Sequence, residues 1–157
     1  MRDDLLLRPF KPADADVVVS WLRSADDAVA VAGARAPWPY RAADLVRASR
    51  EAGRSPFTVT STVDPTAVLG HVAVVVVTPT AGRLARVVLA PHLRGRGRSG
   101  RVLALAVAEA QRVGLRELTL FVVPGNVAAT RAYEAAGFRV APADPQHPEY
   151  VRMTRTV

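Results

Sequence analysis

The chain is 157 residues long and half of its residues are hydrophobic, which suits one domain with a core of its own. It contains no cysteine, so disulfides, thiolate metal ligands and a cysteine nucleophile are excluded. The net charge is +7, and the acid-free segment between Asp64 and Glu109 contains six arginines, nearly the whole positive excess.

The first half of the chain predicts a short strand, two helices and then a run of strands. Asp14 caps one expected helix, whose apolar residues recur at helical spacing, and Asp44 caps another that runs through Arg50 and stops near Gly53. The expected strands are Leu5–Arg8, Phe57–Thr62, Val68–Val77 and Leu84–Leu89. Turn residues at 64–66 and 79–82 join the last three, which favours antiparallel pairing.

The second half predicts helices that alternate with strands. A helix over Arg101–Val113 is followed by a fully apolar strand over Leu118–Val123, and this strand–helix–strand order favours parallel pairing with Leu84–Leu89. A short helix from Asn126 to Gly137 precedes the last expected strands, Phe138–Ala141 and Tyr150–Thr156. The predicted fold class is therefore α/β, with a mixed, mostly antiparallel central sheet flanked by helices in a single domain over residues 1–157.

A segment rich in glycine and arginine, LAPHLRGRGRSG, connects the strand ending at Leu89 to the helix that follows; we call it the glycine segment. A glycine turn before a helix presents free backbone N–H groups, and arginines add forked donors, so the segment predicts a phosphate-bearing ligand. It contains a literal GxGxxG, the dinucleotide fingerprint. That interpretation is disfavoured because residues 91–94 separate the strand from the first glycine, and no GK[ST] of a phosphate-binding P-loop is present.

Two spaced motifs carry a family resemblance. The run VVLAPHLRGRGRSGRVL resembles the pyrophosphate loop of the GCN5-related N-acetyltransferases (GNAT), with Arg94, Gly97 and Ser99 on the positions of [QR]-x-x-G-x-[GA]; Ser99 departs from Gly or Ala but is small. Residues 126–138 resemble the same family's N-x-x-[AS]-x-x-x-[YF]-x-x-x-G-F. The opening around residues 7–22 is similar to the branch that includes ribosomal-protein N-terminal acetyltransferases.

The resemblance implies the GNAT fold, in which a parallel pair of central strands is splayed, and acetyl-CoA as co-substrate with no metal. It implies catalytic roles for the Leu89 amide, which would polarise the thioester carbonyl, and for Tyr133, which would protonate the departing thiolate. The residues that it implies for cofactor binding are Val87, Val88, Leu89, Arg94, Gly95, Arg96, Gly97, Arg98, Ser99, Gly100, Asn126 and Tyr133. Arg101 is a further candidate for the phosphates of coenzyme A.

The spacing of Asn126 and Tyr133 agrees with these roles independently. The two residues are seven apart, about two helical turns, and so share one face of a helix. Asn126 can cap the helix and hold a ligand amide, and a phenol stays protonated at neutral pH and can donate to a leaving group. The alternative is that Asn126 is only a cap and that Tyr133 only packs against the sheet.

The general base and the acceptor stay open in the sequence. The strands around the glycine segment carry no suitably placed glutamate, and the candidates His71, His92, Asp144, His147 and Glu149 compete with a water relay. The acceptor would be a protein or peptide amine or a small-molecule amine. The loops expected to line its side are Ala32–Arg41, with Trp38 and Tyr40, and Pro142–Glu149.

Two other functional classes compete with an enzyme. The missing glutamate favours a non-catalytic acyl-CoA-binding module, and the positive segment favours a nucleic-acid binder. Nucleic acid is not expected, because no aromatic residue for base stacking occurs between Phe57 and Phe121. The longest apolar run is too short to span a bilayer and the N-terminus does not resemble a signal peptide. We therefore expect a cytoplasmic monomer or homodimer without membrane contact.

Overall fold

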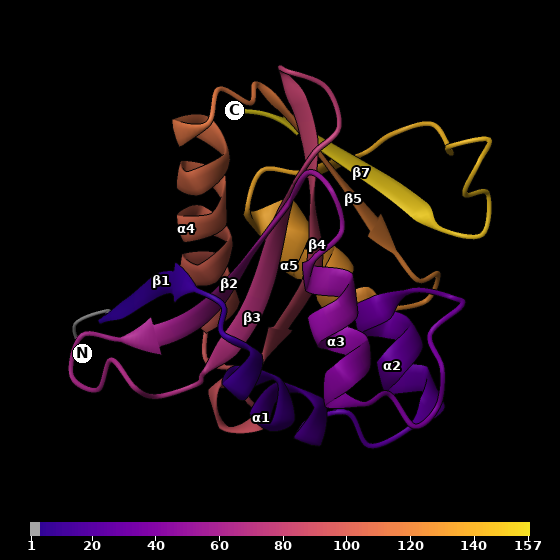
Figure 1. The fold of residues 1–157 in the computed structure, drawn as a ribbon. Helices are drawn as coiled ribbons and strands as arrows, with labels where there is room; N and C mark the ends of the chain where they lie inside the picture. Colours follow the sequence, from indigo (N-terminus) through magenta and orange to yellow (C-terminus); the bar gives the residue numbers. More distant parts are fainter. Residues whose placement is uncertain (1–3) are drawn as a thin grey trace.

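A computed structural model describes residues 4–157, so the first three residues of the domain expected over 1–157 lie outside the described range. In that range the strands form one seven-stranded sheet in the order β1-β2-β3-β4-β5-β7-β6 (Figure 1). All neighbouring strands pair antiparallel except β4 and β5, which are parallel, so the predicted fold class is confirmed. The strands are β1 Leu5–Pro9, β2 Arg54–Ser61, β3 Gly70–Val76, β4 Ala81–Leu89, β5 Glu117–Val122, β6 Arg139–Val140 and β7 Val151–Thr156.

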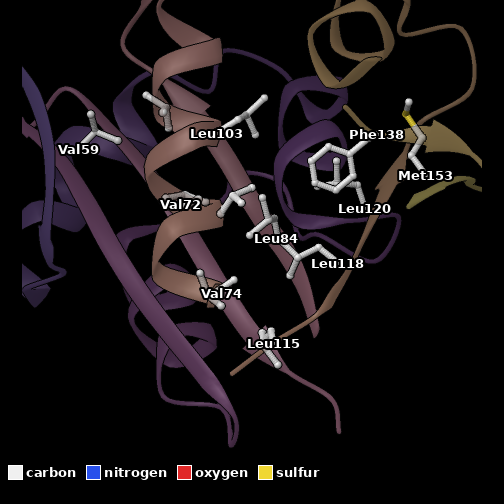
Figure 2. Packing of buried hydrophobic residues seen from close by; sticks show 14 of the residues in the cluster. Val59, Val72, Val74, Leu84, Leu103, Leu115, Leu118, Leu120, Phe138 and Met153 are labelled. Atoms are coloured by element: carbon white, nitrogen blue, oxygen red, sulfur yellow. The ribbon is translucent and has the colours of Figure 1, made fainter. Parts of the chain in front are cut away.

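Helices cover both faces of the sheet (Figure 1). Helix α4 (Arg98–Arg112) and α5 (Val127–Ala135) lie on one face, and α1 (Ala15–Ser20), α2 (Ala25–Ala32) and α3 (Ala42–Ser49) lie on the other. Each face has its own hydrophobic cluster. The larger cluster, on the α4 side, includes Leu103, Leu118, Phe138 and Met153 (Figure 2), and the smaller one packs α1 and α3 against the sheet. Within residues 4–157, no helix has the length and apolar character that a membrane span requires.

Helix α2 was not predicted, and two predicted caps are corrected. Ser24 caps α2 by accepting a hydrogen bond from the Asp27 amide at 3.1 Å, which is the local signal that the sequence reading missed. Asp14 lies at the cap position of α1 but makes no side-chain cap bond to that helix; it is also the third residue of the preceding 3-10 turn, Pro12–Asp14. Asp44 lies at the third position of α3 instead of its cap position. Each carboxylate reaches back to the amide three residues earlier, from Asp14 to Lys11 at 2.9 Å and from Asp44 to Arg41 at 2.8 Å.

The helix after the glycine segment begins three residues earlier than predicted. Gly97 adopts a left-handed conformation (φ +73°) at the cap, and Arg98 is already the first helical residue of α4. At the other end, Gly114 (φ +89°) ends the helix, and the Leu115 amide donates to the Ala110 carbonyl at 3.0 Å, as the predicted glycine cap requires. The last three residues of the glycine segment therefore form the first turn of α4.

The parallel pair β4–β5 is short. Its register covers only Ala81–Arg83 against 117–119, and beyond these residues the two strands diverge (Figure 1). Glycine is required at position 82, because a Cβ there would lie 2.4 Å from the Val75 carbonyl oxygen and 2.6 Å from Leu115. The splayed central pair that the family resemblance implies is therefore present, and it leaves a gap in the sheet.

Strand β4 also contains a bulge on its other edge. The β3–β4 register passes from His71 opposite Val88 to Ala73 opposite Ala85, so Val72 alone faces the two residues Arg86 and Val87. Arg86 has a positive φ of 51°, which is uncommon for a residue with a side chain. A bulge bends its strand and re-aims the bulged side chain, and this one lies beside the gap between β4 and β5.

Candidate active site

Where β4 and β5 diverge, a cavity of about 510 Å³ opens between them; we call it the first cavity. Its walls come from the end of β4, the glycine segment, the end of β5, one side of α5, and the segment from the end of α1 through α2. Most of the residues predicted to bind the cofactor line it: Val87, Val88, Leu89, Arg94, Gly95, Gly97, Ser99, Asn126 and Tyr133. Residues that are up to 46 positions apart in the chain, from Val87 to Tyr133, thus fold around one space.

Leu89 is the last residue of β4 and lies on the wall of the first cavity. The next residue still bonds toward β3, because the Ala90 amide donates to the Leu69 carbonyl at 2.9 Å. The Arg94 Nε donates to the Leu89 carbonyl at 3.0 Å, so this side chain holds the glycine segment against the end of β4.

The glycine segment has a backbone conformation that leaves it open to close approach. Gly95 and Gly97 have φ of +71° and +73°, and a Cβ at either position would meet no atom within 4 Å, so glycine serves the backbone conformation and not tight internal packing. The first turn of α4 follows at once and carries no acidic residue. Its free N–H groups and the positive end of the helix dipole together favour a phosphate.

Three predicted cofactor residues, Arg96, Arg98 and Gly100, do not line the first cavity. The Arg98 guanidinium lies 3.9 Å from the Asp4 carboxylate, so its side chain is directed to the N-terminal segment. What Arg98 and Gly100 can offer a ligand from the first turn of α4 is their backbone N–H.

Asn126 and Tyr133 lie on the wall of the first cavity, as their spacing predicted. The Asn126 Oδ1 accepts from the Ala129 amide at 3.2 Å, which confirms it as the cap of α5. The Tyr133 ring packs edge-on against Phe138, with ring centroids 6.3 Å apart. Burial raises the pKa of Tyr133 to about 12, so the phenol stays protonated over the physiological pH range.

A second cavity of about 450 Å³ adjoins the first. It lies among α2, the arginines of β2 and β4, the end of β5 and the loop between β6 and β7. The two cavities share six wall residues: Ala30, Val31, Val87, Phe121, Val123 and Tyr133. A group bound in one cavity and a group bound in the other would therefore meet beside Tyr133.

Of the five candidates for the general base, only two lie on the wall of a cavity. His147 and Glu149 line the second cavity, whereas His71, His92 and Asp144 line neither cavity. The His147 ring packs 5.1 Å from the Phe121 ring, centroid to centroid. His71 is fully buried beside Phe10, and burial, followed by the nearby charges of Arg86 and Arg54, lowers its pKa to about 4.

The aromatic wall suggested for Trp38 and Tyr40 is absent from both cavities. Tyr40 is buried in the cluster of α1 and α3, and Trp38 is exposed. Instead, Phe121 and Tyr150 contribute the aromatic surface, and the Ala34 amide donates to the Tyr150 hydroxyl, joining two loops. Sequence reasoning also missed Arg54, whose role depends on strand register. The presence of two charged residues, Arg83 and Arg86, in an otherwise apolar strand could have indicated a polar site on this face of the sheet.

In the range 4–157, no group of three His, Asp or Glu side chains is arranged to hold a metal ion. The first cavity instead offers backbone amides and a protonated phenol, which suit an acyl donor with phosphate groups.

Comparison with solved structures gives close agreement in fold at low sequence identity. AAC(6')-Ib in complex with ribostamycin and coenzyme A superposes with a TM-score of 0.79 at 18% identity, over 98% of this chain and 94% of that one. Ard1 from Thermoplasma volcanium gives 0.73 at 18% identity, over 99% of both chains. Spermidine N-acetyltransferase from Vibrio cholerae, in complex with CoA and spermine, gives 0.71 at 17% identity, over 99% and 96%.

Comparison with curated protein sequences finds no match. The sequence model of the acetyltransferase (GNAT) family, however, matches residues 16–138, most of the chain, and this range includes the glycine segment and helix α5. The chain therefore belongs to the acetyltransferase (GNAT) family.

Proposed function

We propose that this N-acetyltransferase moves an acetyl group from acetyl-CoA to a primary amine by direct attack in a ternary complex. The observation that carries the proposal is the wall that the two cavities share at Ala30, Val31, Val87, Phe121, Val123 and Tyr133. The thioester would lie in the first cavity and the amine in the second, so that no covalent enzyme intermediate is needed.

Coenzyme A would lie along β4 and the glycine segment. The pyrophosphate would receive hydrogen bonds from the amides of residues 95–100, at the N-terminus of α4. The pantetheine arm would fill the gap beside β4 by pairing with the backbone of Val87 and Leu89. The Leu89 amide would stabilise negative charge on the thioester oxygen during attack. Arg96 and Arg101 remain candidates for the outer phosphates.

The transfer forms a C–N bond and breaks the C–S bond. The amine nitrogen attacks the acetyl carbon, the sulfur leaves with the electron pair of the C–S bond, and a proton must reach it. Tyr133 would donate to the sulfur, since burial keeps its phenol protonated with the pKa raised to about 12. The surplus proton of the amine would leave through a base or water, and His147 and Glu149 are the predicted candidates on the wall of the second cavity.

The acceptor class includes the possibilities that the neighbours illustrate. Ribostamycin and spermine occupy structures of similar fold, and both are small molecules with amines. The resemblance of the opening residues to N-terminal acetyltransferases supports a protein or peptide amine instead. A non-catalytic acyl-CoA-binding module is the competing function. Release of thiol from acetyl-CoA over a panel of amines separates the two, because a module would bind CoA without turnover of any amine.

Replacement of Tyr133 by phenylalanine tests the chemical role directly. We expect Tyr133→Phe to lower kcat by about a hundredfold or more while CoA affinity stays nearly unchanged, because general acid catalysis contributes on that order. Thiol release and calorimetric CoA binding would be measured side by side. Tyr40→Phe is the matched control, since Tyr40 is buried outside both cavities. Unchanged turnover in Tyr133→Phe would contradict the acid role.

A further inference from the structure

The second cavity carries a concentration of positive charge that acetyl transfer alone does not require. Four arginines line it, Arg35, Arg54, Arg83 and Arg86, against two carboxylates, Glu51 and Glu149. Both carboxylates are on exposed residues, whereas Arg54, Arg83 and Arg86 are partly or largely covered. A binding wall of this sign attracts an anion and repels a polycation.

The sheet places Arg54 and Arg83 on the same surface. Arg54 of β2 lies opposite Val75 of β3, and Val75 in turn lies opposite Arg83 of β4. Residues directly opposite one another point to the same face, so the two arginines flank Val75 with their strands roughly 10 Å apart. Arg86 joins them through the bulge, since its positive charge acts on Arg54 more strongly than that of Arg83.

The guanidinium groups lack partners at the atoms that are buried. The Arg54 side chain is only 4% exposed, and its Nη2 donates to Glu51 at 3.1 Å, but its Nε and Nη1 are buried without any partner. The Nε atoms of Arg83 and Arg86 are buried and unpartnered as well. A buried charged donor without an acceptor is costly, and native structures rarely leave such groups unused.

The protonated form of Arg54 is destabilised by its surroundings. Burial is the largest cause that lowers the pKa of Arg54, and the charge of Arg86 lowers it further, with Glu51 opposing only in part. An anion between the guanidinium groups would supply the missing acceptors and relieve the repulsion among them.

We propose that the second cavity binds a small acceptor amine through an anionic group, a carboxylate or a phosphate, that pairs with Arg54, Arg83 and Arg86. The inference rests on the proposed function for the identity of the amine as acceptor. The cavity volume of about 450 Å³ fits a small molecule. The amine end would point to Tyr133, which the two cavities share, and the anionic end to the arginines. Polycationic acceptors of the spermine kind would be disfavoured.

Two measurements test the anion site and the transfer separately. Acetyl transfer is compared for γ-aminobutyrate against butylamine and for phosphoethanolamine against ethanolamine, because each pair differs in the anionic group. Calorimetry measures the binding of glutarate, which has no amine to acetylate. We expect at least one anionic amine to exceed its neutral partner in kcat/KM by about tenfold or more, and glutarate to bind the wild-type protein.

Arg83→Gln and Arg54→Gln should weaken glutarate binding by about tenfold. If Arg54→Gln fails to fold, Arg83→Lys serves as the second variant. It keeps the positive charge and should therefore retain part of the glutarate affinity. Arg50→Gln is the matched control, because Arg50 is exposed, lines neither cavity and changes the net charge equally. A preference for the neutral amines, or equal glutarate binding by Arg83→Gln and Arg50→Gln, would overturn the anion site. Glutarate binding without transfer to any amine would contradict the proposed function alone.

Discussion

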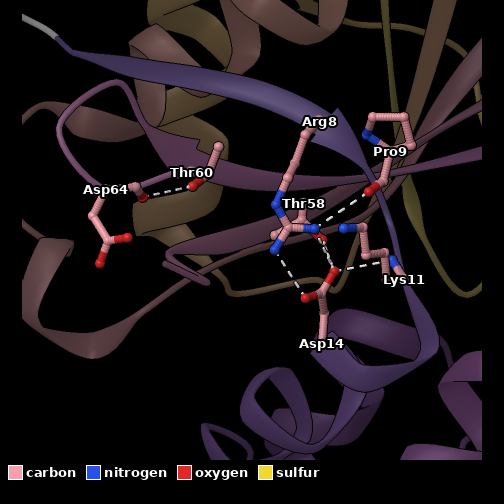
Figure 3. A network of polar contacts seen from close by, with 7 residues as sticks. All are labelled: Arg8, Pro9, Lys11, Asp14, Thr58, Thr60 and Asp64. Carbon is pink, nitrogen blue, oxygen red and sulfur yellow. Dashed lines mark hydrogen bonds and ion pairs between the residues drawn. The ribbon is translucent and has the colours of Figure 1, made fainter. Parts of the chain in front are cut away.

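Asp14 is nearly buried and still charged, because its carboxylate is surrounded by donors (Figure 3). Arg8 binds both of its oxygens, at 2.8 and 2.9 Å, and Oδ2 also accepts from the Lys11 amide and the Thr58 hydroxyl. Burial raises the pKa of Asp14, but the hydrogen bonds from Arg8, Lys11 and Thr58 outweigh it and bring the pKa to about 2. The residue thereby fastens the start of α1 to strands β1 and β2.

Asp14→Asn should destabilise the fold by about 3 kcal/mol at neutral pH, since it removes one partner of a buried ion pair. The folded pKa of about 2 lies below the ordinary aspartate pKa of 3.8, so the stabilisation is complete above pH 3.8 and is lost as pH falls toward 2. Urea unfolding at several pH values checks this, and the deficit of the variant should shrink in that acid window. The exposed Asp16→Asn should cost little at any pH.

Residue roles that depend on local spacing could be predicted, and roles that depend on register could not. Asn126 and Tyr133 share a helix face, so a count of positions was enough to place both on one wall. Arg54 and Arg83 come together only through the pairing of β2, β3 and β4, and Arg86 joins them through a bulge that shifts the register by one residue. Sequence alone does not fix a bulge.

Among the elements, the glycines at the two ends of α4 explain why its end was predicted correctly and its start was not. Gly114 marked the end of α4 correctly, because it follows the last periodic apolar residue. Gly97 and Gly100 were both taken as loop residues, but only Gly97 needs the left-handed conformation, and Gly100 is already helical. Helix α2 was not predicted, although Ser24 caps it. Strand β6 covers two of the four predicted residues, although the Ala141 amide still donates to the Arg152 carbonyl of β7 at 2.9 Å.

The two ends of α4 offer a matched test of the glycine segment. Gly97→Glu and Gly114→Glu both place a side chain at a positive φ, +73° and +89°, with no atom within 4 Å of the new Cβ. The strain and the change of charge are therefore the same, and each should cost about 1 kcal/mol of stability. Only Gly97 lines the first cavity, so only Gly97→Glu should abolish CoA binding in calorimetry. If Gly97→Glu kept its affinity for CoA, or if both variants lost it equally, the assignment of the glycine segment as the phosphate site would be wrong.

For the whole molecule, the fold separates arginines that the sequence groups together. Arg83 and Arg86 line the second cavity, Arg94 braces Leu89, and Arg98 lies beside Asp4. The arginines therefore lie in different parts of the structure and do not form one continuous positive surface. A continuous positive surface is what a nucleic-acid binder would need. A nucleic-acid binder would show affinity that falls steeply with salt and that CoA does not displace.

His71 should govern the stability of the whole fold at mildly acid pH. Its folded pKa of about 4 lies below the ordinary histidine pKa of 6.5, so the unfolded chain takes up a proton first and stability declines as pH falls from 6.5 to 4. The expected loss is about 3 kcal/mol. His71→Leu should remove this decline in urea unfolding, while His92→Leu, at an exposed position, should leave it unchanged. An undiminished decline in His71→Leu would contradict this origin.

The overall architecture was predictable because most strands alternate with strong turn residues and one strand–helix–strand unit fixes the parallel pair. What could not be predicted is the length of that pair. Pairing of β4 with β5 ends at Arg83 and Thr119, shortly before the bulge on the other edge of β4.

Because the short pairing of β4 with β5 leaves room for a ligand, it also links the lifetime of the protein to the concentration of that ligand. A ligand that occupies the gap binds the folded chain and not the unfolded one, so it stabilises the fold by mass action, by about 2.7 kcal/mol at a hundred times its Kd. Turnover of the protein by proteases acts on opened forms. A cell rich in the acyl donor would therefore keep more of this enzyme, without any change in its synthesis.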